Sequence, residues 1–235
     1  MKIVKHLILT LVVISVFTNC NANSETGKKV NAQEVLPENG PIEKFWIWFK
    51  EQEQQLKKFE ENPDKYLTEI HTEAQKIKAG LVIELEPPQN GVINMTVSAD
   101  GDKNLFEDVK SIIAKAPKIE GWNFLAFRQR ISLEKVKRMK LKVGDEELDP
   151  AKMKFFPVVS GKDLDIIIYT KGVTEENYTQ IAYNGLLLLD NILGEYDCVT
   201  KVRSYDFHDM PTKKKELEGL MPLIELPAYV DKFHK

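Results

Sequence analysis

The chain has 235 residues, with 33 Lys and Arg residues against 36 Asp and Glu residues, and its formal net charge is −3. Hydrophobic residues make up 43% and charged residues 29% of the chain. This composition is typical of a globular protein and excludes disordered, collagen-like and coiled-coil classes for most of the chain. Because nucleic-acid-binding domains carry a strong excess of basic residues, we expect no nucleic-acid partner. The 2 cysteines are too few for a disulfide scaffold.

An export signal is predicted at the N-terminus. Two lysines precede an apolar run over residues 7–17, which is shorter than the roughly 20 residues that span a bilayer. Cys20 and a polar stretch follow this run. The pattern resembles a bacterial lipoprotein signal, in which residues 1–19 form the signal peptide and the cysteine carries the lipid, although Asn19 stands where a small residue is usual. The alternatives are cleavage after Ala22, which leaves a soluble periplasmic protein, and an uncleaved anchor.

A tether and one folded body are predicted after the signal. Residues 20–40 comprise the lipid-anchor Cys20 and a polar stretch with few large apolar side chains, which indicates a flexible linker. Twenty such residues span roughly 25 Å, which would hold a folded domain away from a membrane surface. We expect residues 41–210 to form an α+β domain and residues 211–235 to form a C-terminal extension packed on it.

A helical hairpin is predicted to open the folded body. Apolar residues recur at helical spacing from Pro41, and a second helix begins at Pro63 and stops at Gly80. The elements expected next are strands at residues 81–85 and 92–97, a helix from Asp102 to Pro117, and a strand at residues 122–128.

The same order of elements is predicted in the second half of the body. Both halves then follow a ββαβ order, which suits either an internal duplication or simply a common way of covering a sheet. The predicted fold class is α+β: an antiparallel sheet with helices mainly on one face, in two ββαβ units preceded by the helical hairpin. The elements of the second half are strands at residues 152–159 and 164–169, a helix at residues 174–193, and a strand at residues 198–207.

The helix at residues 174–193 is expected to be the most buried element of the protein. Four consecutive leucines, residues 186–189, make it apolar nearly all round. A glycine inside a helix costs roughly 1 kcal/mol relative to alanine. Gly185 therefore predicts that another element approaches this helix closely.

Three acidic residues near the end of this helix are the best candidates for chemistry. Asp190, Glu195 and Asp197 could carry out acid–base catalysis if one of them were desolvated. The alternative is that they lie at the exposed end of a helix, where acids are slightly unfavourable with the helix dipole. No catalytic residue is assigned on this basis.

Other residues are candidates for ligand binding. Arg128 and Arg130 flank Gln129 at a strand end and could hold an anionic ligand, or could pair with nearby acids. Trp48 lies at the margin of the first helical stripe and could stack on a sugar, although aromatic residues at helical spacing usually belong to the core. Together with Asp190 and Glu195, these residues form the set of predicted ligand-binding positions.

The sequence predicts neither a cofactor nor a metal site. The loop Asp100-x-Asp102-x-Asn104 resembles the start of a calcium loop, but Leu105 and Ser111 occupy the positions that need Gly and Glu. Nucleotide-binding glycine loops and zinc-binding Cys and His pairs are absent from the sequence. Cys198, in a segment predicted as a strand, is interpreted as a small buried hydrophobe.

Several motifs carry a resemblance to a family of uncharacterised bacterial proteins. The segments are PIEKFWIWFKEQEQQL, SADG, GWNFLAFRQR and LLLLDNILGEYDCVTKV. They match the family's Phe-Trp-x-Trp-Phe, Ser-Ala-Asp-Gly, Trp-x-x-x-Ala-Phe-Arg and Leu-Leu-Asp-x-x-Leu-Gly-Glu-Tyr-Asp motifs across most of residues 41–207. The resemblance implies a single evolutionary unit and a bacterial source, and it implies no particular reaction.

The expected function is that of a lipid-anchored protein of the bacterial cell envelope, in the periplasm or at the outer membrane. We expect a non-enzymatic binding module that contacts the membrane through its N-terminal lipid and binds a protein or a surface polymer. An immunity-like protein that neutralises a toxin is one form of this hypothesis. The alternatives are a hydrolase or other enzyme that uses the carboxylates near the long helix, and a purely structural envelope component.

Overall fold

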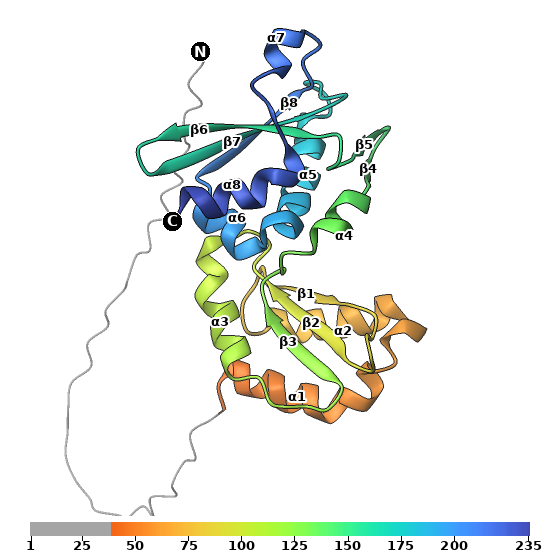
Figure 1. Cartoon of the computed structure of the whole chain (residues 1–235). Helices are drawn as coiled ribbons and strands as arrows, with labels where there is room; N and C mark the ends of the chain where they lie inside the picture. The colour runs from red at the N-terminus through yellow and green to blue at the C-terminus, as the bar shows by residue number, and fades with distance from the viewer. Residues whose placement is uncertain (1–38) are drawn as a thin grey trace, which may run out of the picture. The chain divides into compact units, whose positions relative to one another are not determined.

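The computed structural model describes residues 39–235 (Figure 1). The predicted signal peptide, the lipid-anchor Cys20 and the predicted tether up to residue 38 lie outside the described residues. Within the described part of the chain, no helix is both long enough and apolar enough to cross a membrane.

The described residues form an α+β fold, as predicted. Several helices begin where the sequence offers a cap; for example, the side chains of Asn62 and Ser132 accept hydrogen bonds from backbone N–H groups in the first turn. The N-terminal half contains helix α1 (Pro41–Leu56), 3-10 helix η1 (Phe59–Glu61), α2 (Pro63–Gln75), strands β1 (Val82–Leu85) and β2 (Ile93–Ser98), η2 (Lys103–Leu105), α3 (Phe106–Ala114) and β3 (Trp122–Ala126). The C-terminal half contains α4 (Leu133–Arg138), β4 (Leu141–Val143), β5 (Glu146–Leu148), β6 (Lys154–Ser160), β7 (Asp163–Thr170), α5 (Tyr178–Leu193), α6 (Glu195–Lys201), β8 (Ser204–Asp209), α7 (Lys214–Leu217), β9 (Met221–Pro222), η3 (Leu223–Glu225) and α8 (Leu226–Phe233).

Each half contains a sheet of its own, built in the predicted ββαβ order. In the first sheet the strand order is β1-β2-β3, and in the second it is β8-β7-β6-β9. The first two strands of each unit pair antiparallel, with Leu85 opposite Met95 and Phe155 opposite Ile168. The internal duplication stays a prediction, because strand order alone does not separate it from a common way of covering a sheet.

The expectation of an antiparallel sheet holds for the first two strands of each unit but not for the third, so both sheets are mixed. β3 runs parallel to β2, with Phe124 opposite Met95, and β8 runs parallel to β7, with Phe207 opposite Ile168. In both units a helix lies between these strands and carries the chain back along the sheet. A strand reached by such a crossover is parallel to its neighbour, so the ββαβ order itself requires mixed sheets.

Each sheet packs against its own hydrophobic core. In the N-terminal half, Phe49 of α1 is fully buried and lies against the rings of Trp122 and Phe124 of β3, at centroid distances of 4.9 and 5.3 Å. The indole N–H of Trp46 donates to the carbonyl of Ile112 in α3 at 2.9 Å. Through these contacts α1 packs on the first sheet and against α3.

In the C-terminal half, helices cover one side of the sheet (Figure 1). Leu164, Ile166 and Ile168 of β7 point to this side and are buried with residues of α5, α6 and α8. Residues 211–235 add to the same core: β9 pairs with the start of β6, and Leu226 and Val230 of α8 are fully buried.

The long helix differs from its prediction in both extent and burial. It begins at Tyr178, while Thr174 and Asn177 form a preceding turn in which their side chains accept backbone hydrogen bonds. Leu186 is 42% exposed, so the helix is not buried on all sides. The prediction of a close approach at Gly185 is confirmed, because a Cβ atom there would collide with the ring of Phe207 in β8.

The segment after the long helix also differs from its prediction. Gly194 ends α5 with a φ of 80°, as expected from a glycine. The chain then forms the short helix α6, and the strand begins only at Ser204. Cys198 therefore lies on a helix and not on a strand. Alternating apolar residues over so short a segment do not distinguish a strand from two helical turns.

Candidate functional site

The carboxylate of Glu195 joins the two halves of the described chain. The residue is fully buried, with 0% exposure, at the start of α6. Its Oε1 accepts hydrogen bonds from the backbone N–H groups of Ala99 (2.9 Å) and Gly101 (3.3 Å). Its Oε2 accepts from the hydroxyl of Ser98 (2.8 Å) and the backbone N–H of Arg128 (3.1 Å). Four donors from outside α6 therefore hold this side chain.

The guanidinium of Arg128 lies beside Glu195 and binds three further carboxylates. Its Nε donates to Glu84 on β1 (2.6 Å), its Nη1 to Asp190 on α5 (3.1 Å) and its Nη2 to Asp100 after β2 (2.9 Å). Arg128 is only 8% exposed. We call the following residues the junction: Glu84, Ser98, Asp100, Arg128, Asp190 and Glu195.

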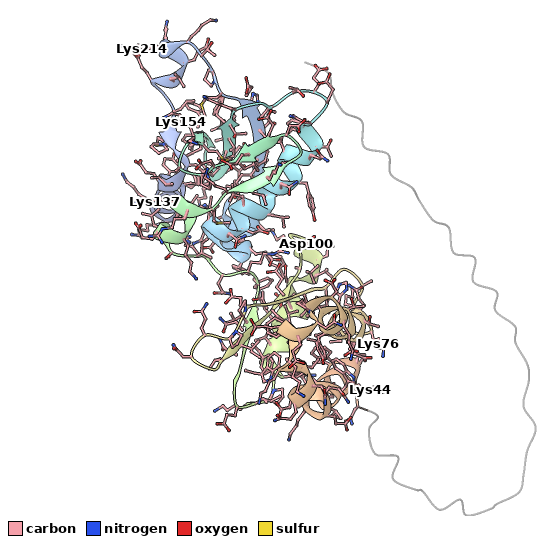
Figure 2. All side chains as sticks on the ribbon, turned by 90° about the vertical axis from the view of Figure 1, so that its right-hand side faces the viewer. Lys44, Lys76, Asp100, Lys137, Lys154 and Lys214 are labelled. Atoms are coloured by element: carbon pink, nitrogen blue, oxygen red, sulfur yellow. The ribbon has the colours of Figure 1, made fainter. Side chains whose placement is uncertain are left out.

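Unusual backbone conformations bring the junction together. Asp100 and Phe127 have positive φ values of 49° and 66°, which are uncommon for residues with a side chain. At Phe127 the turn directs the chain from β3 into Arg128, and the ring is held between those of Phe106 (4.7 Å) and Tyr196 (5.4 Å). Figure 2 shows Asp100 where the turn after β2 meets the C-terminal half.

A pocket of about 290 Å³ opens beside the junction. Its wall is mostly apolar, and its polar residues include the carboxylates of Asp100 and Asp190. Residues of both halves line it: Asp100, Gly101, Tyr183, Leu186, Leu187, Asp190, Cys198, Val199, Val202, Arg203 and Tyr205. The volume is near the lower limit for pockets that hold small molecules.

Asp190 has a strongly altered affinity for protons. The pKa of Asp190 is raised to about 6, because the effects of burial and of the nearby charge of Glu195, which raise it, outweigh those of the contacts with Cys198 and Arg128, which lower it. Perturbed pKa values of this kind are common at functional sites and also occur in structural ion-pair networks. For Arg128, burial lowers the pKa, but the carboxylates of Glu84 and Asp100 outweigh this effect and raise it overall.

The side chain of Cys198 is held in the thiol form, which is a poor nucleophile. Its Sγ lies 3.3 Å from the hydroxyl of Tyr205, and this hydroxyl donates to the carbonyl of Cys198 at 3.1 Å. Burial and the charge of Asp190 raise the pKa of Cys198 well above its usual value. Since the thiolate is the reactive form, the thiol is kept unreactive, as expected for a buried hydrophobe.

Arg130 and Asp197 are not among the residues that line the pocket, and they pair with each other and with other residues. The guanidinium of Arg130 donates to Asp231 of α8 (2.8 and 3.1 Å), to Asp197 (3.3 Å) and to the carbonyl of Leu193 (3.1 Å). Asp197 also pairs with Lys201 at 2.9 Å. Arg130 therefore ties the end of α5 to α8, and the prediction that Asp197 shares a site with Asp190 is not supported by these contacts.

Within residues 39–235, the ring contacts of Trp48 are with residues of its own helix and not with the junction. It is half-buried on α1, with ring contacts to Phe45 (6.2 Å) and Phe49 (6.4 Å) of the same helix. A separate shallow groove between α1 and α2 includes it. The lining residues of this groove are Trp48, Gln52, Thr68, Glu69, Thr72 and Glu73.

The structure thus brings together three of the predicted ligand-binding residues: Arg128, Asp190 and Glu195. The interpretation of Asp190 and Glu195 as the exposed end of a helix is wrong, since Asp190 is 6% exposed and Glu195 is fully enclosed. Sequence analysis missed Glu84 and the part played by Ser98 and Asp100. The Ser-Ala-Asp-Gly segment is one of the motifs in the sequence, and its backbone N–H groups at Ala99 and Gly101 donate to Glu195.

Within residues 39–235, no group of three or more His, Cys, Asp or Glu residues is placed to hold a metal ion. At the junction, the guanidinium of Arg128 lies among the carboxylates of Glu84, Asp100 and Asp190. Comparison with family models, curated proteins and solved structures found no match to the chain.

Proposed function

We propose that this protein is an exported, lipid-anchored binding module of the bacterial cell envelope. The lysines, apolar run and Cys20 of the N-terminus support the export and lipid anchor, with a soluble periplasmic protein as the alternative. Contact with the membrane would come from the lipid on Cys20. The partner would be a protein or a surface polymer, and an immunity-like role belongs to the same proposal.

The observation that carries the binding role is the apolar pocket beside the junction. Leu186 and Tyr183 of α5 line the pocket. Both side chains are exposed, while other apolar side chains of the same helix are buried. Apolar side chains at the mouth of a concave pocket are typical of ligand sites. Both carboxylate oxygens of Glu195 and all three guanidinium nitrogens of Arg128 form hydrogen bonds within the protein, which suits a rigid binding site.

Lipid labelling tests the anchor. Radiolabelled palmitate is fed to a bacterium that expresses the full-length chain, and the Cys20→Ala and Cys198→Ala variants are labelled in parallel. The expected result is labelling of the wild type and of Cys198→Ala, and none of Cys20→Ala. Equal labelling of all three proteins would remove the anchor from the proposal, and a membrane-bound but unlabelled wild type would point to an uncleaved signal.

A second candidate function, an enzyme that uses a carboxylate near the end of α5, rests on Asp190 alone. This residue faces the pocket and its pKa is raised to about 6, which places its proton exchange close to neutral pH. A panel of ester, amide and glycoside substrates tests this role. Turnover that disappears in Asp190→Asn and persists in Asp197→Asn supports an enzyme, whereas turnover unchanged in Asp190→Asn excludes this residue.

A further inference from the structure

The charge around the pocket beside the junction is strongly unbalanced. The carboxylates of Glu84, Asp100, Asp190 and Glu195 outnumber the guanidinium of Arg128 that they surround. Glu195 accepts hydrogen bonds from the backbone N–H groups of Ala99 and Gly101, which carry no positive charge. In a poorly solvated region such an excess of negative charge acts more strongly than it would in water.

The cations on the pocket wall do not cancel this excess. Of the described residues that line the pocket, Arg203 alone carries positive charge. Its Nη1 binds Asp163 at 2.6 Å, and its Nε and Nη2 bind Asp165. Its charge is therefore largely neutralised by carboxylates on β7. Asp100 and Asp190 share the single guanidinium of Arg128 with Glu84, so an excess of negative charge remains at the pocket.

The remaining wall is apolar. Leu186 and Leu187 of α5 form one side, and Val199 and Val202 at α6 form another. The aromatic rings of Tyr183 and Tyr205 complete the lining. Apolar walls bind an aliphatic or aromatic group, and tyrosine faces also attract cations, so the wall and the carboxylates select for the same type of ligand.

We propose that this pocket binds an organic ammonium group attached to an apolar stem. The stem lies against the leucines and valines, and the ammonium lies toward Asp100 and Asp190. A small molecule can supply this group as a free amine, and a partner protein can supply it as a lysine side chain. The inference rests on the proposed binding role and is independent of the lipid anchor.

Titration with matched probes tests this inference. Full-length protein labelled at Leu and Val methyl groups is titrated with 2-phenylethylamine, 3-phenylpropanoate and 2-phenylethanol, which differ in charge and share the phenyl stem. N-acetyl-lysine methylamide serves as the lysine probe. We expect shifts of the pocket methyl groups and a Kd for an ammonium probe at least ten-fold lower than that for the carboxylate. Tighter binding of the free amine or of the lysine probe identifies the source.

Two variants assign the binding to this pocket. Leu186→Arg places a cation at the mouth of the pocket and should abolish amine binding, whereas Leu133→Arg, at a similarly exposed leucine of α4, should leave it unchanged. Asp190→Asn should reduce the preference for the amine over the alcohol by at least five-fold. If Asp190→Asn does not fold, Leu186→Arg still decides the outcome, because the side chain that it replaces is exposed.

Two results would overturn the inference. One is equal affinity for the amine and the carboxylate, and the other is amine binding that survives Leu186→Arg. Failure of palmitate labelling at Cys20 removes the anchor without affecting these titrations. Failure of every probe to bind, with labelling intact, removes the ammonium ligand and leaves the anchored protein.

Discussion

The central strands of the two ββαβ units, β2 and β7, occupy the same place in their sheets but differ in burial. In β2 both faces are covered, since Met95 and Thr96 point in opposite directions and both are buried. In β7 buried and half-buried residues alternate, and Ile167 is only half-buried. On the outer side of the second sheet, Phe156 and Val158 of β6 are exposed.

The junction explains this difference. Glu84 lies opposite Thr96 in the ladder of β1 and β2, so the two side chains share a face of the first sheet. Arg128 binds Glu84, so the junction lies on the part of this face near Thr96, while helices cover the other face. Within residues 39–235, nothing comparable to the junction packs on the outer face of the second sheet. Two units with the same strand order thus bury different amounts of surface according to what packs against them.

Removal of Glu195 is expected to have the largest effect on this arrangement. In Glu195→Ala the Ser98 hydroxyl and the backbone N–H groups of Ala99, Gly101 and Arg128 lose their acceptor. Loss of one partner of a buried charged contact costs about 3–5 kcal/mol. Urea denaturation measures the free energy of unfolding.

Two further variants give reference values for the loss of stability in Glu195→Ala. Glu195→Gln retains one oxygen acceptor and should lose less stability than Glu195→Ala. Glu134→Ala, at an exposed glutamate paired with Lys137, should change stability by less than about 0.5 kcal/mol. A loss below about 1 kcal/mol in Glu195→Ala would mean that the two halves do not depend on this side chain.

Matched substitutions on the two central strands test the difference in burial directly. Thr96→Phe adds volume beneath the junction, where the residue is buried, and is expected to cost about 2–3 kcal/mol. Ile167→Phe places the larger side chain on the open outer face and should cost less than about 0.5 kcal/mol. Thermal and urea unfolding of both variants gives the comparison, and equal losses would contradict it.

The helices of the two units also differ in glycine content where they pack on their sheets. Gly185 in α5 lies against the ring of Phe207, whereas α3 contains no glycine. Gly185→Ala should destabilise the protein by about 1–3 kcal/mol through overpacking, although alanine favours helix. Gly219→Ala is the control, because its Cβ would meet Phe156 at an ordinary distance of 3.9 Å. A stabilised Gly185→Ala variant would show that the helix can shift.

The smallest expected effect is a dependence on pH through Asp190. The folded-state pKa of this carboxyl is about 6, above its ordinary value of 3.8, so the folded protein holds the proton more tightly than the unfolded chain does. The stability contributed by Asp190 is therefore complete below pH 4 and is lost as the pH rises through 6. The stability of the wild type relative to Asp190→Asn should fall by about 1–2 kcal/mol between pH 4 and pH 7.

Other ionisable groups lie near Asp190, and their own titration could contribute to the pH dependence of stability. Arg128, Glu195, Cys198, Asp100 and Tyr205 face this carboxyl or lie beside it from the neighbouring elements. Burial raises the pKa of Tyr205 and of Cys198 far above this range, and Arg128 stays protonated throughout it. A constant difference between the wild type and Asp190→Asn from pH 4 to pH 7 would contradict the raised pKa.

The sequence by itself determined the order of the elements and much of their local geometry. Helical spacing, the helix start at Pro63, the end of the long helix at residue 193 and the glycine at Gly185 are local signals, and the structure confirms each of them. Asp190, Glu195 and Arg128 were also recognisable as unusual residues. Local signals arise from backbone sterics and side-chain periodicity, which act within a few residues of the chain.

Only the tertiary structure decided the burial of the acidic residues and the position of the pocket. Glu195 binds Ser98 across 97 positions of sequence, and Arg128 binds Asp190 across 62. Such contacts depend on where two separately formed sheets place their ends. An acid at a helix terminus looks the same in the sequence whether water or an opposite element surrounds it, and its burial is settled by packing between distant segments.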